Sequence, residues 1–71
     1  MREDKKEQAL RLQKKLEHWI AHNKDHAESF RKAARDAEEI GLVEVGKRLQ
    51  EAAEKMEEIA AVLEGAIKEI A

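Results

Sequence analysis

All three histidines of the chain lie within nine residues, beside its single tryptophan. His18, His22 and His26 are spaced four apart, which on a helix places them in one slanted row of neighbouring side chains. Two neutral imidazoles four residues apart can bind one metal ion together, as they do in the helices of zinc proteases. His18 and His26 would lie about 12 Å apart along the helix axis. One helix is therefore predicted to offer two ligands, His22 and His26, with His18 as a further candidate.

A metal ion held by two histidines needs further ligands. A tetrahedral site could take the same pair from a symmetry-related copy, a carboxylate or water. Glu57 is the nearest acidic candidate, because a hairpin would place it at about the height of His26. Asn23 is expected to orient the site and Trp19 to shield it. Zinc, nickel and copper ions all suit imidazole ligands, and the residues do not choose among them.

Two other interpretations of the same residues stand beside metal binding. In the first, Asn23 and His26 form a buried polar pair that sets the register and the number of partners in a helical bundle, without any ligand. The chain would then be a structural or oligomerisation module. In the second, a histidine at the boundary of the bundle becomes charged below about pH 6.5 and loosens a dimer.

The histidines lie in a segment whose apolar and small residues recur in alternating steps of three and four. This heptad pattern continues through Asn23 without a change of phase, which predicts one helix over about residues 2–40. The alternative is a three-helix bundle with a break near Asn23, since Asp25 and Glu28 resemble a capping box. The predicted contact residues of this first helix are Ala9, Leu12, Leu16, Trp19, Asn23, His26, Phe30, Ala33, Ala37 and Ile40.

A second heptad pattern follows Gly41. A glycine directly after the last apolar position is typical of a helix C-terminus, and Leu42 can supply the apolar contact that accompanies such an end. The second helix is predicted over about residues 43–70, in an antiparallel hairpin that forms one domain over residues 1–71. Its predicted contact residues are Leu42, Val45, Leu49, Ala52, Met56, Ile59, Leu63, Ala66 and Ile70.

Both apolar stripes are wider than a two-stranded coiled coil requires. Further apolar residues border the two patterns on one side: Ile20, Ala27, Ala34, Ala53, Ala60 and Ile67. A lone hairpin would leave part of such a stripe in water, so two hairpins are expected to form a homodimeric four-helix bundle.

Composition excludes several classes of function. The 14 basic and 16 acidic residues are interleaved and give a net charge of −2, so no nucleic-acid partner is expected. The apolar runs are short, which predicts no membrane span and a cytoplasmic protein. No cysteine is present, no acidic residue occupies a predicted contact position, and Ser29 is the only hydroxyl residue. Thiolate catalysis, di-iron chemistry and a serine nucleophile are therefore not expected, and the chain is predicted not to be an enzyme.

One stretch carries a resemblance to a known group of proteins. Residues 16–30 contain His18-Trp19 and His22-Asn23, followed by His26-Ala27. They resemble a family of small uncharacterised prokaryotic domains with the pattern H-W-x-x-H-N-x-x-H-A, and the likeness extends over about residues 10–70. It implies that the histidines act together and names no ligand. From Phe30 onward the chain is also faintly similar to the helical hairpins of rubrerythrin and ferritin relatives.

Overall fold

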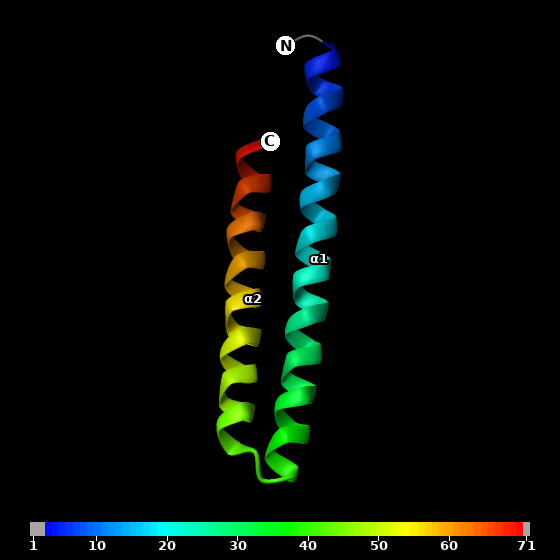
Figure 1. Cartoon of the computed structure of the whole chain (residues 1–71). Coiled ribbons are helices and arrows are strands. Elements are labelled where there is room, and N and C mark those ends of the chain that lie inside the picture. Colours follow the sequence, from blue (N-terminus) through cyan, green and yellow to red (C-terminus); the bar gives the residue numbers. More distant parts are fainter. Residues whose placement is uncertain (1–2, 71) are drawn as a thin grey trace.

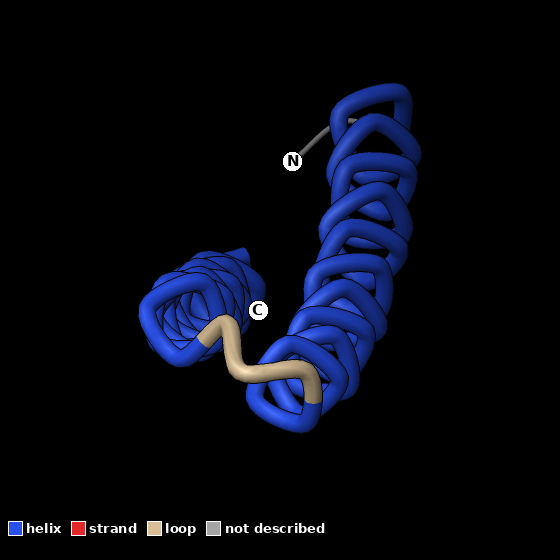
Figure 2. Tube along the Cα trace, turned by 60° about the horizontal axis from the view of Figure 1, so that its bottom comes forward, coloured by secondary structure: helices blue, strands red, loops and turns tan. Residues whose placement is uncertain are grey.

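The computed structural model describes residues 3–70 and consists of two antiparallel helices. Helix α1 spans Glu3–Glu39 and helix α2 spans Val43–Ile70. One short loop joins them (Figures 1 and 2). The predicted all-α hairpin, with helices over about 2–40 and 43–70, is confirmed, and position 2 lies outside the described residues. In residues 3–70 neither helix contains a segment of the length and apolarity needed to cross a bilayer.

Helix α1 continues without interruption through Asn23. The alternative of a three-helix bundle with a break near Asn23 is therefore wrong. Asp25 and Glu28 do resemble a capping box, but capping competes with helical hydrogen bonds only where the chain has another reason to stop. The helix contains neither glycine nor proline, and its apolar pattern keeps its phase on both sides of Asn23.

The end of α1 is a Schellman motif built on Gly41. The φ angle of Gly41 is +86°, in the left-handed region where a residue without a Cβ is favoured. Its N–H donates to the carbonyl of Glu38 at 3.1 Å, and the N–H of Leu42 donates to the carbonyl of Ala37 at 2.8 Å. These two bonds satisfy carbonyls that the helix end would otherwise leave unpaired and turn the chain back on itself.

Small side chains make the contact between the helices. Ala34 and Ala53 are both 0% exposed, and such small residues allow two helix backbones to approach closely. The buried residues are Leu16, Ile20, Ala27, Ala34 and Ala37 on α1, with Gly46, Ala53 and Ala60 on α2. Most of these buried residues were expected to lie beside the contact between the helices rather than in it.

The prediction of which residues face the other helix is therefore wrong: on each helix the contact is displaced around the helix by one row of residues. Trp19, His26 and Ile40 were expected to face the other helix, but all three are exposed, Trp19 to 46%. Alanine and glycine permit the closest approach, so the helices pack through the small-residue row. The bulkier residues then lie to one side of the contact, where they remain open to solvent.

Two ion pairs join the helices. Arg31 pairs with Glu57, and Lys24 pairs with Glu64 at 3.7 Å. Both are partly exposed, so each contributes little to stability. Because α1 ends at Glu39 and α2 begins at Val43, the 28 residues of α2 reach back only to about the height of residue 12. The N-terminal end of α1 therefore extends beyond α2 within the described chain (Figure 1).

Two glycines of α2 are predicted to respond in opposite ways to replacement by alanine. A Cβ at Gly65 would meet nothing within 4 Å, whereas one at Gly46 would lie 3.0 Å from Glu38 Cγ and 3.1 Å from the Ala34 carbonyl oxygen. Gly65→Ala should raise the free energy of unfolding by up to about 1 kcal/mol through helix propensity. Gly46→Ala should lower the melting temperature, because the α1 backbone must move. Equal stabilisation by both variants in thermal unfolding would contradict the close approach at Gly46.

Candidate functional site

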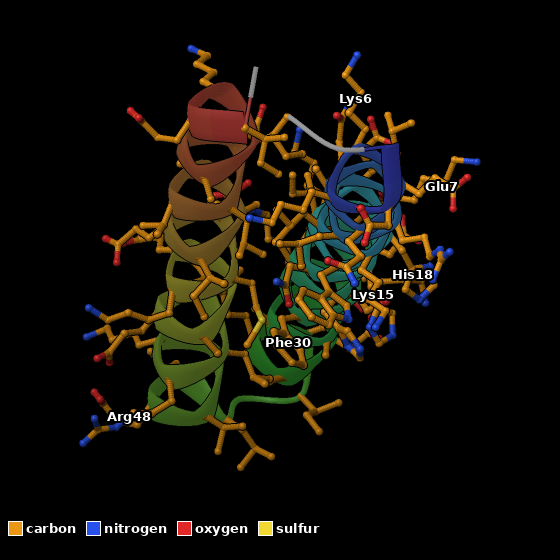
Figure 3. The ribbon with its side chains drawn as sticks, turned by 90° about the horizontal axis from the view of Figure 1, so that it is seen from above. Lys6, Glu7, Lys15, His18, Phe30 and Arg48 are labelled. Carbon is orange, nitrogen blue, oxygen red and sulfur yellow. The ribbon has the colours of Figure 1, made fainter. Side chains whose placement is uncertain are left out.

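The three histidines form an exposed row on α1. His18 projects from the side of α1 away from α2, and Phe30 lies between the helices (Figure 3). Each step of four residues rotates the row by about 40° around the helix. The row therefore begins on the outer side of α1 at His18 and turns toward the hairpin contact at Phe30.

His22 and His26 are brought together at their outer ring nitrogens. The two Nε2 atoms are 3.1 Å apart, so in the neutral pair one Nε2–H donates to the other Nε2. The two rings meet edge to face, with centroids 4.4 Å apart. His18 stacks on His22 at 6.0 Å and at an interplanar angle of 16°. The structure thus brings the rings of His22 and His26 into contact on one side of the helix.

The spacing of the two Nε2 atoms fits a hydrogen bond and is also compatible with two ligands on one metal ion. Nitrogens bound about 2.0–2.1 Å from zinc at a tetrahedral angle lie about 3.3 Å apart, and a square-planar arrangement brings adjacent nitrogens to about 2.9 Å. The observed separation of 3.1 Å lies between these values. An ion could therefore replace the shared proton with only a small movement of the rings.

The pair is only part of a metal site. Among residues 3–70 no group of three or more histidine, cysteine, aspartate or glutamate side chains is positioned to hold one ion. Glu57 is not brought to the histidines, because its carboxylate pairs with Arg31. Arg31 follows His26 by five residues and so lies about 140° around α1 from it. Glu57 was expected near His26 from its height in the hairpin alone, but its side chain points to the other flank of the hairpin.

The expected supporting residues differ in their exposure. Asn23 is half-buried, whereas His26 is exposed, so the hairpin does not hold them as the buried polar pair considered above. Trp19 lies one turn before His22 and is exposed beside the row. Phe30 was missed as a neighbour of the histidines, yet its ring lies 5.8 Å from that of His26. The spacing of four residues from His26 to Phe30 is the signal that could have predicted this contact.

One flank of the hairpin is apolar and the other is charged. The pairs Arg31–Glu57 and Lys24–Glu64 lie on the charged flank. His26 lies about 140° from Arg31 around α1, and Ile59 lies about 200° from Glu57 around α2. The residues at seven-residue spacings from these two form the opposite flank, here called the apolar face: Leu12, Trp19, His26, Ala33, Ile40, Val45, Ala52, Ile59 and Ala66. All of them are exposed or half-buried.

The fold places the chain in a class of protein, the small α-helical hairpins. The chain belongs to the family described as Domain of unknown function (DUF8180), which matches residues 12–70. It is also similar to an uncharacterized protein of Archaeoglobus fulgidus, with 40% identity over 52 residues that cover 73% of this chain and 82% of that protein.

These matches confirm the resemblance to an uncharacterised family of small prokaryotic domains. No solved structure matches the chain. The faint similarity to rubrerythrin and ferritin hairpins is not supported.

Proposed function

We propose that this chain is a homodimeric helical-bundle protein that binds a divalent transition metal ion through His22 and His26. The observation that carries the proposal is the 3.1 Å separation of the two Nε2 atoms. Imidazole suits zinc, nickel and copper ions, and the paired rings are exposed, so an ion can reach them from solution. The role is binding rather than catalysis, and the protein is proposed to act in the cytoplasm.

Dimerisation is the second part of the proposal and is supported by the apolar face. This face includes Trp19, Ile40, Val45 and Ile59, each more than two-fifths exposed. Exposed apolar surface that is continuous over two helices is characteristic of an interaction site. A non-catalytic association module without metal is the second candidate function, and the same face favours it.

Metal binding is tested by thermal unfolding with and without Zn²⁺ or Ni²⁺. Free metal at 100 times the dissociation constant should stabilise the folded protein by about 2.7 kcal/mol, which corresponds to a rise in melting temperature of about 10–20 °C for a domain of this size. The single variants His22→Ala and His26→Ala should lose most of this rise, because each removes one imidazole of the converging pair. The rings of His18 and His22, which remain in His26→Ala, are stacked 6.0 Å apart.

His18→Ala is the matched control, since His18 belongs to the same row but does not contribute to the converging pair. It should retain the metal-dependent shift. The proposal would be overturned by a melting temperature that does not respond to metal, together with no metal in the purified protein by elemental analysis. In that case the association module would be the better description.

A further inference from the structure

We infer that the His22–His26 pair selects Cu²⁺ and holds it in a square-planar shell that a small α-amino acid completes. The two imidazoles occupy two neighbouring positions of the shell, and the amino nitrogen and carboxylate oxygen of the amino acid occupy the other two. The inference rests on the proposed function, in which this pair binds the metal. It adds the identity of the metal, the number of positions that stay open and the class of ligand that fills them.

The first support is the number of donors that the structure brings together. The Nε2 atoms of His22 and His26 are 3.1 Å apart. The carboxylate of Glu57 is engaged by Arg31, and over residues 3–70 no third histidine or carboxylate is positioned to join the pair on one ion. A four-coordinate ion on this pair therefore keeps two neighbouring positions for ligands from solution.

The small number of protein ligands favours copper over zinc. Structural zinc sites use four protein ligands and catalytic zinc sites use three. Divalent copper binds nitrogen donors more tightly than nickel or zinc does, and it takes nitrogen and oxygen donors in a square-planar or tetragonal arrangement. Adjacent nitrogens in that arrangement lie about 2.9 Å apart, which is close to the separation of 3.1 Å in the structure.

Neighbouring rings contact the two imidazoles from both ends of the row. His18 stacks on His22 with the ring centroids 6.0 Å apart, and the ring of Phe30 lies 5.8 Å from that of His26. Phe30 is half-buried and lies between the helices (Figure 3). These contacts restrict the rotation of the two imidazoles before an ion arrives, which lowers the entropic cost of binding.

The open positions of the ion are accessible from solution. Both imidazoles of the pair are exposed, and His18 projects from the side of α1 away from α2 (Figure 3). A ligand with two donors can fill both open positions at once. Its second donor then binds within the same complex, at a high effective concentration, so such a ligand binds more tightly than two separate donors.

Charge favours an anion as the ligand that completes the shell. Two neutral imidazoles leave Cu²⁺ with both of its positive charges. Along α1, Lys15 precedes His22 by two turns and Asp25 follows it by three residues, so their opposite charges largely offset each other. A carboxylate lowers the charge of the complex, and an amino group supplies a further nitrogen donor for copper. An α-amino acid combines these two donors at chelating distance.

Electron-spin resonance of the Cu²⁺ complex tests the inference, with glycine as the probe ligand. Protein with an equal amount of Cu²⁺ should show coupling to two imidazole nitrogens. Addition of an equal amount of glycine should add coupling to a third nitrogen, and glycine labelled with ¹⁵N should change the splitting from that nitrogen alone. Oxalate, which has two oxygen donors, is the comparison ligand and should add no nitrogen coupling.

The fluorescence of Trp19 reports whether copper stays on the protein. Trp19 is the only tryptophan of the chain and precedes His22 by three residues, so the two side chains are neighbours on the helix surface. Bound Cu²⁺ should quench its fluorescence, and the quenching should persist when glycine is added. His26→Ala should weaken Cu²⁺ binding by about 10²–10⁴-fold, because one of two linked ligands is lost. His18→Ala is the matched control and should keep both the quenching and the coupling to glycine.

The outcomes separate this inference from the proposed function. Recovery of Trp19 fluorescence on addition of glycine would mean that glycine removes the copper, and this would overturn the inference. A resonance spectrum that glycine leaves unchanged, or tighter binding of Zn²⁺ than of Cu²⁺, would also overturn it. Each of these results leaves metal binding by His22 and His26 standing. If the protein bound none of Cu²⁺, Ni²⁺ and Zn²⁺, the proposed function would be refuted as well.

Discussion

Replacement of Ala53 by aspartate is expected to remove much of the stability of the hairpin. Ala53 is 0% exposed in the contact between α1 and α2, two helical turns beyond Gly46, which lies against the backbone of Ala34. An unpaired carboxylate there loses its hydration without gaining a partner, at about 3–5 kcal/mol. A chain of this length has a total stability of about 4–10 kcal/mol. Thermal unfolding followed by circular dichroism should show a melting temperature lowered by about 12–40 °C.

Ala61→Asp is the control for this experiment, because Ala61 is exposed on the same helix. The two variants share the change in helix propensity and in net charge and differ in burial. Ala61→Asp should leave the melting temperature within a few degrees of the wild type. If the two variants unfolded at the same temperature, α1 and α2 would not be in contact at Ala53.

Ile59→Glu is expected to convert the proposed dimer into a monomer that keeps its helices. A dimer that forms through the apolar face would bury the introduced carboxylate in an apolar environment, where it loses its hydration without gaining a partner. The hairpin contact is made by another row of α2 and should survive. Analytical ultracentrifugation should give the monomer mass of 8.1 kDa, with the circular dichroism spectrum little changed.

Ala61→Glu is the matched variant. Ala61 is exposed and lies about 200° around α2 from Ile59, away from the apolar face. It introduces the same carboxylate and should remain dimeric. A dimer that withstands Ile59→Glu but dissociates on Ala61→Glu would place the interface on the opposite flank of α2.

The secondary structure could be predicted from the residues alone because its determinants are local. The uninterrupted heptad pattern predicts α1 through Asn23, and Gly41 followed by Leu42 predicts the turn. The phase of the contact could not be predicted in the same way. Periodicity shows that each helix has a wide apolar stripe, but it does not show which edge of the stripe meets the other helix. That choice depends on how closely the backbones can approach, which Ala34 and Ala53 decide.

In the candidate site, features set by one helix could also be predicted, whereas features set by the packing of the two helices could not. The pairing of His22 with His26 follows from their spacing on one helix, so it could be predicted. The position of Glu57 depends on how each helix is rotated about its own axis relative to the contact, and the packing of the two helices sets both rotations. His26 is exposed for the same reason, because the helices pack through the row of small residues and not through the row that contains His26.

The Schellman turn at Gly41 has a consequence for the order of assembly. Contacts between α1 and α2 can form one after another outward from this turn, so each new contact closes only a small additional loop. Helical proteins rich in such contacts fold in microseconds to milliseconds. Two copies at micromolar concentration meet far more slowly, at typical rate constants of about 10⁵–10⁷ M⁻¹s⁻¹. Each newly made chain is therefore expected to fold as a monomer, with contacts forming outward from the turn. In the proposed dimer the partner would be found afterwards, so the extent of dimerisation would depend on the concentration of the protein.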